Sequence, residues 1–186
     1  MKRLADFLAA LVGLAVFAPL WLVLAILIRL DSPGPVLFRQ IRVGWQGREF
    51  VLFKFRSMRT DTPNLSTAEL QATGLEPYTG LGKWLRRTSL DELPQLWNVL
   101  RGEMSLVGPR PALPSQTALN LGRKEHGVEA LRPGITGWAQ INGRDDLTDE
   151  EKLSRDMEYL LRQSLILDVS IIGRTIVTIF TGKGNK

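Results

Sequence analysis

The run FLAALVGLAVFAPLWLVLAILI at residues 7–28 decides how the rest of this sequence is interpreted, because it holds no charged residue over 22 positions. As a helix it would extend about 33 Å at roughly 1.5 Å per residue, enough to cross the hydrocarbon core of a bilayer. Pro19 lies near its middle, where a proline removes a backbone hydrogen bond and bends or breaks the helix. We therefore expect an apolar membrane helix that is interrupted at Ala18 and Pro19.

Basic residues flank this run on both sides, with Lys2 and Arg3 before it and Arg29, Arg39 and Arg42 after it. The positive-inside rule keeps both flanks on the cytoplasmic side of a membrane. A re-entrant helix, which enters the membrane, bends and returns to the same face, satisfies both the length and the charges. A kinked single span and a cleaved secretory signal are the alternatives that these residues leave open.

The composition describes one folded domain rather than a disordered chain. Of 186 residues, 44% are hydrophobic and 23% are charged, and the net charge is +5. The chain has no cysteine, which excludes a disulfide scaffold, a Cys-ligated zinc site and a cysteine nucleophile. A single histidine, His126, argues against a His-rich metal site or a Ser-His-Asp triad. The positive charge would suit a nucleic-acid binder, but the apolar N-terminus argues against that class.

Beyond the apolar run, the pattern predicts a β-hairpin from strands at 36–43 and 49–56, joined by the turn at 44–47. The period of two places Lys54 and Arg56 on one face of the second strand and Val51, Phe53 and Phe55 on the other. The polar stretch 60–82 predicts a loop with a short helix at 66–72. Residues 81–100 are expected to be helical with a break near Ser89, and three prolines exclude a long helix over 102–114.

Two helices are predicted near the C-terminus. Residues 147–163 carry charges on one face and apolar residues on the other. Residues 165–180 are rich in Ile, Val and Leu, with Asp168 and Arg174 as their only charges, and fit either a buried core helix or one lying in a membrane interface. The fold class is therefore α+β: a largely helical single domain with a short β-hairpin, an N-terminal re-entrant membrane helix (1–30) and interfacial amphipathic helices in a cytoplasmic unit (31–186).

The segment TSLDELPQL at residues 88–96 carries the strongest chemical signal, because Asp91 and Glu92 are adjacent at the start of a predicted helix. One such carboxylate can attack an electrophile while the other serves as a base, and both are oxygen ligands of the kind Mg²⁺ prefers. The structural alternative is that Ser89 and Glu92 form a capping box.

Cationic residues surround this pair in the sequence, and arginine recognises phosphate oxygens by two parallel hydrogen bonds. Acidic residues with Arg and Lys, without cysteine or a usable histidine, suit metal-assisted phosphoryl transfer better than acyl transfer. Taken singly, each basic residue also fits a solvated surface charge. The candidates for binding phosphate are Lys54, Arg56, Arg86, Arg110 and Arg144, with Arg110 stiffened by Pro109 and Pro111.

Five motifs together resemble the bacterial sugar transferase family, whose members are monotopic phosphoglycosyl transferases. They are KFRSMR at 54–59, SLDELPQLWNVL at 89–100, GEMSLVGPRP at 102–111, RPGITGWAQ at 132–140 and NGR at 142–144. The resemblance runs from residue 2 to about residue 180. It implies transfer of a sugar 1-phosphate from a nucleotide diphosphate sugar, usually a UDP-sugar, to polyprenyl phosphate (undecaprenyl phosphate), with release of UMP. It also implies a site at the cytoplasmic face of the bacterial inner membrane, where such transfer begins surface-glycan assembly.

The resemblance assigns roles to the candidate residues. Asp91 would be the nucleophile that forms a covalent sugar-phosphate intermediate, and Glu92 would help to hold Mg²⁺ or act as a base, so that both carboxylates are metal ligands. Lys54, Arg56, Arg86 and Arg110 would neutralise phosphate charge, the loop of Pro109, Arg110 and Pro111 would lie near the uridine, and Arg144 would bind substrate.

One departure concerns the helix break, where family members often carry Ser-Pro and this chain has Ala18-Pro19. A serine hydroxyl can satisfy a freed carbonyl and alanine cannot. Two rival functions remain open at this point: a membrane glycosyltransferase that releases UDP, and a non-catalytic membrane scaffold.

Overall fold

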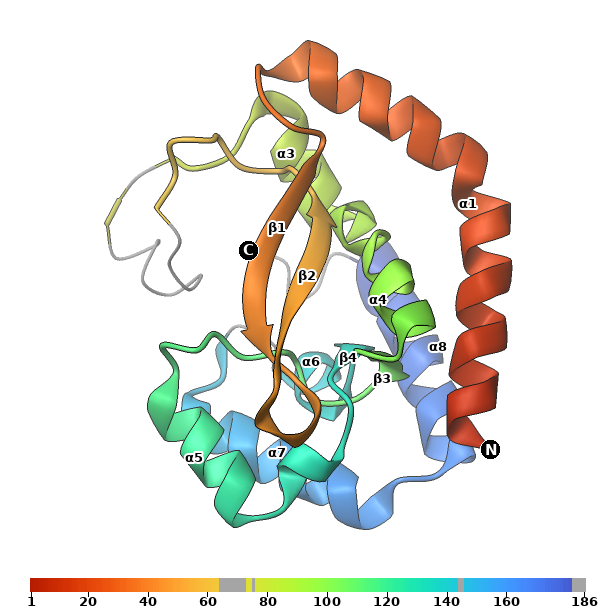
Figure 1. The fold of residues 1–186 in the computed structure, drawn as a ribbon, viewed down its shortest axis with the longest axis vertical. Coiled ribbons are helices and arrows are strands. Elements are labelled where there is room, and N and C mark those ends of the chain that lie inside the picture. Colours follow the sequence, from red (N-terminus) through yellow and green to blue (C-terminus); the bar gives the residue numbers. More distant parts are fainter. Residues whose placement is uncertain (64–72, 75, 144–145, 182–186) are drawn as a thin grey trace.

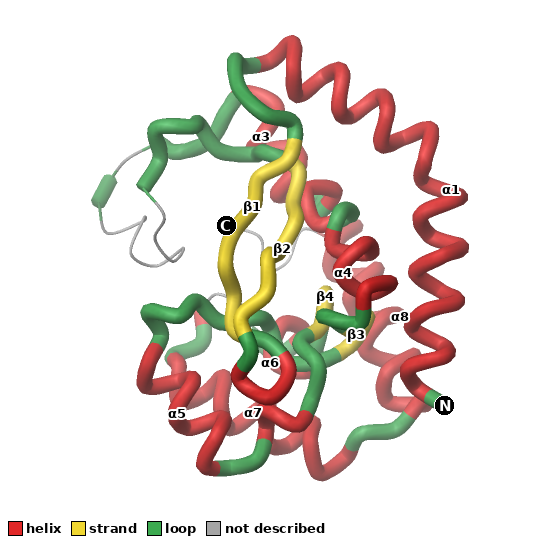
Figure 2. Tube along the Cα trace, viewed as in Figure 1, coloured by secondary structure: helices red, strands yellow, loops and turns green. Residues whose placement is uncertain are grey.

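The computed structural model describes residues 1–63, 73–74, 76–143 and 146–181 of the chain. The predicted helix at 66–72 therefore lies outside the described residues. Figures 1 and 2 show a hairpin in the middle of the molecule with helices around it. The elements in chain order are α1 (Lys2–Asp31), β1 (Leu37–Val43), η1 (Trp45–Gly47), β2 (Glu49–Phe55), α3 (Gly80–Arg87), η2 (Leu90–Glu92), α4 (Gln95–Arg101), β3 (Ser105–Val107), α5 (Thr117–Glu125), η3 (Val128–Ala130), β4 (Gly134–Thr136), α6 (Trp138–Ile141), α7 (Asp149–Arg162) and α8 (Leu165–Thr181).

The mixed helix and sheet class is confirmed, and so are the main predicted elements. Strands β1 and β2 pair antiparallel, from Leu37 opposite Phe55 to Val43 opposite Glu49. The helical stretch before and after Ser89 is interrupted there, since α3 ends at Arg87 and α4 starts at Gln95. The two C-terminal helices lie where the apolar periodicity placed them.

Strands β3 and β4 were not predicted. They form a separate parallel pair, with Ser105 opposite Gly134 and Val107 opposite Thr136. Each has three residues, which is too short for an alternating pattern to be recognised in the sequence. Helix α5 was also missed, because its nine residues follow a proline-rich stretch and include Gly122.

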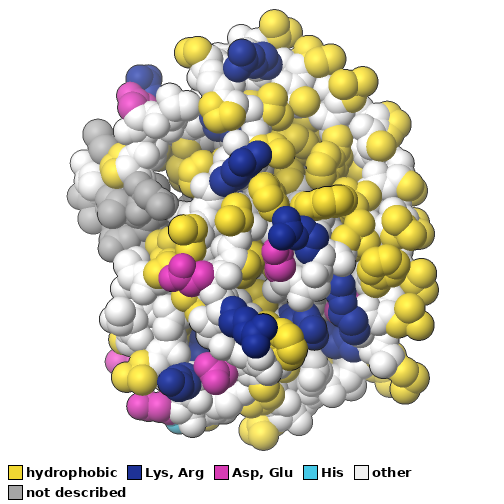
Figure 3. Space-filling view, in the orientation of Figure 1, with side chains coloured by type: hydrophobic (Ala, Val, Ile, Leu, Met, Phe, Trp, Pro, Cys, Tyr) yellow, Lys and Arg dark blue, Asp and Glu magenta, His cyan; other side chains and the backbone are white. Residues whose placement is uncertain are grey.

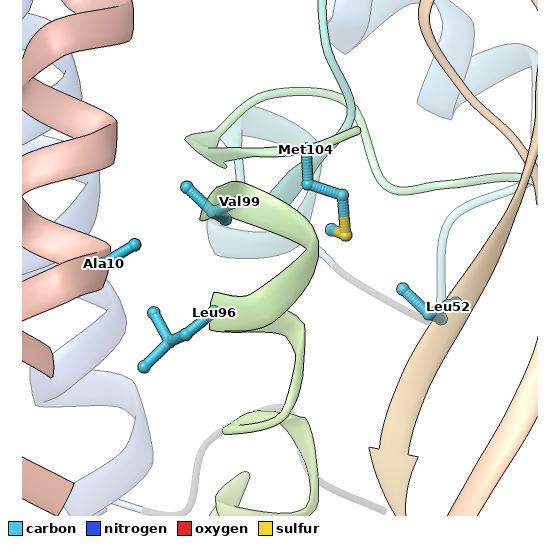
Figure 4. Close-up of a cluster of buried hydrophobic side chains, with 5 residues drawn as sticks. All are labelled: Ala10, Leu52, Leu96, Val99 and Met104. Atoms are coloured by element: carbon cyan, nitrogen blue, oxygen red, sulfur yellow. The ribbon is translucent and has the colours of Figure 1, made fainter. Parts of the chain in front are cut away.

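Helix α1 is continuous from Lys2 to Asp31 with Pro19 inside it, so the predicted interruption at Ala18 and Pro19 is wrong: the helix accommodates the proline without ending. Figure 1 shows it running along one side of the molecule and bending toward α3 in its second half, as expected of a helix that contains a proline. Its first half packs on α4 in the cluster drawn in Figure 4, where α1 contributes a small residue that lets the two helices approach closely. The cluster consists of Ala10, Leu52, Leu96, Val99 and Met104.

Both ends of α1 are attached to the same folded body. Near the N-terminus, the Arg3 guanidinium donates to the carbonyls of Val99 (2.6 Å) and Leu100 (2.9 Å) in α4. The Asp6 carboxylate accepts from the Ser105 hydroxyl of β3 at 2.8 Å. At the other end, the Arg56 guanidinium donates to the carbonyl of Ile28 at 3.0 Å. Hydrogen bonds near both ends therefore hold α1 against the rest of the domain.

The outer faces of α1 and α8 are apolar and exposed. Among the described residues, α1 is the one helix long and apolar enough to cross a membrane. In Figure 3, hydrophobic side chains gather along the side of the molecule where Figure 1 places α1. Helix α8 has one face in the core and another exposed, since Ile171 is buried while Ile166 and Val169 are exposed. It therefore has features of both predicted alternatives, the core helix and the interfacial helix.

Strand β2 is attached to α4 by one fully buried side chain. The Asn98 amide donates to the carbonyl of Val51 at 2.7 Å and accepts from the Phe53 amide at 3.2 Å. These bonds use backbone groups that the two-stranded hairpin leaves unpaired, and an unpaired buried group would be costly. The attachment places Lys54 beside η2.

Candidate active site

The short helix η2 holds the two adjacent carboxylates. It starts from Ser89, which adopts a left-handed backbone with φ of 55°, and Pro94 then begins the approach to α4. A non-glycine residue in this region is uncommon and marks a turn that the surroundings enforce. The reversal between α3 and α4 buries both Asp91 (4% exposed) and Glu92 (8% exposed).

Glu92 is held by cations and not by the backbone of a helix start. Its Oε1 accepts from Lys54 Nζ at 2.7 Å and lies 3.4 Å from Arg110 Nη1. The Ser89 side chain makes no capping hydrogen bond. The capping-box interpretation of Ser89 and Glu92 is therefore wrong. A capping residue usually has an extended backbone, and the backbone of Ser89 is left-handed.

A cavity of about 1210 Å³ opens in front of Asp91, between β1, β2 and α5. This is large enough for a nucleotide sugar. Its wall is mostly basic where it is charged. Its charged lining includes Arg42, Lys54, Arg86, Asp91, Arg110 and Arg123.

Burial sets the protonation of this site. It raises the pKa of Asp91, while the charges of Lys54, Arg86 and Arg110 act in the opposite direction. Burial also lowers the pKa of Lys54, partly offset by the charge of Glu92. The pKa of Arg42 is lowered by burial and then by the charge of Arg110. The site is therefore a desolvated cluster in which each ionised group depends on its neighbours.

The structure brings most of the predicted site residues to one cavity. Lys54, Arg86, Asp91, Arg110 and Pro111 all line it, and Glu92 lies behind Asp91 in contact with Lys54.

The remaining predicted residues are placed differently. Arg56 lines the cavity, yet its guanidinium donates to the carbonyls of Ile28, Ser32 (2.6 Å) and Pro33 (2.7 Å) at the end of α1. Pro109 lies on a second, smaller cavity nearby. Arg144 lies outside the described residues.

Sequence reasoning missed three residues that shape this site. Arg42 was noted only as a flanking charge, and neither Arg123 nor Asn98 was singled out. All three act through backbone groups distant in the sequence, such as the 3.0 Å bonds from Arg42 to the carbonyl of Pro111 and from Arg123 to that of Arg110. An arginine within a strand, at Arg42, was the one local signal available.

The two carboxylates fit a magnesium ion that takes its other ligands from substrate. Mg²⁺ is usually bound by one or two protein carboxylates together with substrate phosphates and water. Asp91 faces the cavity and Glu92 is adjacent, and both offer the oxygen donors that this ion requires. Within the described residues, no group of three or more acidic or histidine side chains converges on one point, so the protein does not form a complete metal cage by itself there.

This chain combines a buried pair of carboxylates, a basic cavity and an apolar helix attached at both ends. A family model for bacterial sugar transferases matches residues 1–182. The chain belongs to the bacterial sugar transferase family.

Named relatives agree with this assignment. An undecaprenyl-phosphate glucose phosphotransferase of Komagataeibacter xylinus is 48% identical over 94% of this chain and 35% of its own length. A UDP-N-acetylgalactosamine-undecaprenyl-phosphate N-acetylgalactosaminephosphotransferase of Aeromonas hydrophila is 42% identical over 100% of this chain and 45% of its own length. The exopolysaccharide production protein PSS of Rhizobium leguminosarum bv. phaseoli is 42% identical over 99% of this chain and 98% of its own length. The chain thus spans less than half of the first two of these relatives and nearly all of the third.

Proposed function

We propose that this protein transfers a sugar 1-phosphate from a UDP-sugar to undecaprenyl phosphate and releases UMP, through a covalent intermediate on Asp91. The observation that carries this proposal is the buried Asp91 carboxylate facing a large cavity lined by cations. The names of the relatives supply the substrate classes.

The charges of the site match a diphosphate. Four basic side chains, Arg42, Lys54, Arg86 and Arg110, lie around the two carboxylates, so positive charges outnumber negative ones in this cluster. A nucleotide diphosphate sugar carries two negative charges at neutral pH. A ligand of that charge would therefore be attracted to the cluster, and in a desolvated site each such contact is stronger than in water.

The reaction would proceed in two displacements. An oxygen of Asp91 attacks the phosphorus next to the sugar, a bond forms between that oxygen and phosphorus, and the bond from this phosphorus to the bridging oxygen breaks. The electron pair leaves with UMP. An oxygen of the lipid phosphate then attacks the same phosphorus, which restores the Asp91 carboxylate and leaves the sugar diphosphate on the lipid.

The neighbouring groups make the first attack feasible. Attack needs the ionised form of Asp91, which burial disfavours and the charges of Lys54, Arg86 and Arg110 favour. Arg110 and Lys54 would also neutralise charge that develops on the departing phosphate. Asp91 and Glu92 are the groups that would hold Mg²⁺, which supplies further neutralisation of the diphosphate when bound.

The proposal includes a re-entrant placement of α1 at the cytoplasmic face of the bacterial inner membrane. The attachment of both ends of α1 to one folded body supports it, because the ends of a full span lie on opposite sides of the bilayer. The exposed apolar face of α1 would then lie in one leaflet, with the cavity near the lipid headgroups.

The nucleotide product tests the reaction. Purified protein in lipid nanodiscs would be given undecaprenyl phosphate, Mg²⁺ and a panel of UDP-sugars. We expect UMP release that requires the lipid phosphate and stops with a chelator. Release of UDP would contradict the role of Asp91 and establish glycosyl transfer. No nucleotide release with any donor, from protein shown to be folded, would contradict catalysis and favour a scaffold.

Cysteine labelling tests the placement, because the natural chain has no cysteine. Leu4→Cys and Leu30→Cys lie near the two ends of α1, and both side chains are exposed. We expect a membrane-impermeant reagent to label both positions from the cytoplasmic side only. Labelling of the two positions from opposite sides would show a full span.

A further inference from the structure

The loop that carries Arg110 is held by its carbonyl groups. Five consecutive carbonyls, from residue 109 to residue 113, each accept a hydrogen bond from another part of the chain. The donors are the Gly134 amide (2.8 Å, to Pro109), Arg123 Nη1 (3.0 Å, to Arg110), Arg42 Nη1 (3.0 Å, to Pro111), the Val43 amide (2.9 Å, to Ala112) and Asn120 Nδ2 (2.9 Å, to Leu113).

The carbonyls of Arg110 itself and of the next residue, Pro111, are the two that accept from arginines. Arg42 belongs to β1 and Arg123 to α5, so two different elements bind the loop. Both arginines also line the cavity. The other three carbonyls of the loop accept hydrogen bonds from uncharged amide groups. Binding a carbonyl therefore does not by itself require a buried guanidinium.

Each of these arginines is itself fixed by a buried partner. Gln40 Oε1 accepts from Arg42 Nε at 2.9 Å and from Arg42 Nη2 at 2.5 Å. Asp156 Oδ2 accepts from Arg123 Nε at 3.0 Å and from Arg123 Nη2 at 2.6 Å. The Asp156 side chain is 2% exposed and the Arg123 side chain 11% exposed. A planar guanidinium held this way has one remaining edge, and in both cases that edge meets the loop.

We propose that Arg42 and Arg123 are positioning residues, which set the backbone of the Pro109–Pro111 loop and thereby aim the Arg110 guanidinium at the phosphate site beside Glu92. The catalytic part of this inference rests on the proposed function. The two arginines add a second effect, since they cover the negative ends of two carbonyl dipoles that would otherwise face an anionic substrate. A displacement of about 1 Å at a charge-neutralising group can cost roughly 10²-fold in rate, so the loop needs such support.

Arg123→Lys is the most informative variant. Lysine keeps the positive charge beside Asp156, but its single ammonium cannot reproduce the fork that binds both the carboxylate and the carbonyl of Arg110. We therefore expect the fold to be preserved while the loop loses one support. We expect kcat for UMP release to fall about 10-fold with a small change in melting temperature, and Arg110→Ala to lower it about 10²-fold.

A double-mutant cycle separates positioning from general destabilisation. If Arg123 acts through Arg110, the variant with both Arg123→Lys and Arg110→Ala should be no slower than Arg110→Ala alone. A structural fault would instead lower the rate further in both backgrounds. Arg132→Lys is the matched control, because Arg132 Nε also donates to a carbonyl, that of Gly102 at 2.9 Å, outside the cavity lining. We expect it to change the rate less than 2-fold.

Hydrogen exchange of the Leu113 amide provides a readout that does not depend on turnover. In the folded chain this amide donates to Gln116 Oε1 at 3.0 Å. We expect Arg123→Lys to speed its exchange about 10-fold or more and Arg132→Lys to leave it unchanged. Unchanged exchange in Arg123→Lys, or a full further loss of rate on top of Arg110→Ala, would overturn the positioning role. If the wild-type protein released no UMP, the proposed function would fail, while the exchange result would still decide whether Arg123 holds the loop.

Discussion

The starts of η2 and α7 carry the same local pattern, a hydroxyl residue followed three positions later by glutamate, and they behave in opposite ways. At Thr148 and Glu151, on the surface, the pattern forms a reciprocal capping box that starts α7. At Ser89 and Glu92 the serine has a left-handed backbone and makes no cap, and the glutamate binds Lys54 instead.

The difference shows that surroundings decide what such a pattern does. Thr148 and Glu151 are exposed to solvent, so the Glu151 carboxylate needs no buried cation and accepts from the Thr148 amide at the helix start. Around Ser89, the neighbouring elements bury the carboxylates and supply cations. An ionised group without solvent binds the strongest available opposite charge. The following predictions test this contrast, in order of decreasing effect.

Asp91→Asn is expected to have the largest effect on activity, a loss of about 10⁴-fold or more, because it removes the proposed nucleophile. It should also raise the melting temperature at pH 7. Burial raises the pKa of Asp91, so ionisation costs the folded state stability once the pH exceeds the unfolded value near ~3.9. Asparagine removes this cost, and the difference in melting temperature should close as the pH falls toward that value. Unchanged UMP release, measured in nanodiscs, would exclude Asp91 as the nucleophile.

Glu92→Gln should lower the rate by about 10²-fold and, unlike the change at the adjacent residue, lower the melting temperature. It leaves the buried ammonium of Lys54 without its 2.7 Å partner, and breaking a buried pair costs roughly 3 kcal/mol. Opposite shifts in melting temperature for two neighbouring carboxylates would sharpen the contrast between them. Equal shifts, measured by calorimetry at one pH, would contradict it.

The pH profile of kcat/KM for UMP release should be a narrow bell. Its acid limb reports ionisation of Asp91, whose pKa burial raises, so activity is lost above the usual aspartate range as the pH falls. Its alkaline limb reports deprotonation of Lys54, whose pKa burial lowers, so activity is lost below the usual lysine range as the pH rises. An acid limb at or below the pKa of an ordinary aspartate would be inconsistent with this site.

Thr148→Ala and Ser89→Ala form the pair with the smallest expected effects. Loss of the α7 cap should cost about 1 kcal/mol and lower the melting temperature by roughly 2–4 °C without changing the rate. Ser89→Ala removes no cap and should change stability by less than half of that. A larger loss at Ser89 than at Thr148, in thermal unfolding, would restore the capping interpretation of the first pattern.

Much of the fold could be predicted from local patterns. Alternating apolar residues identify the β1–β2 hairpin, and helical periodicity identifies α7 and α8, because these elements are long enough to show their period. Strands β3 and β4 could not be found, since each exists only through pairing with a partner distant in the chain.

The candidate site divides in the same way. The quoted motifs contain Lys54, Asp91 and Arg110, Arg86 lies just before one of them, and all four residues line the cavity. The role of Arg56 at the end of α1 was not visible, because its partners are backbone carbonyls more than 20 residues away.

Residue type and short-range spacing were enough to identify the apolar helix, the hairpin, the family and the chemical types of the site residues. Only the folded chain shows which cations reach Glu92, that Ser89 is not a cap, and that Arg42 and Arg123 bind the Arg110 loop. Those outcomes depend on burial and on contacts between distant segments. Removing water from a charged group makes its nearest partner decisive, and the order of residues along the chain does not reveal which partner is nearest.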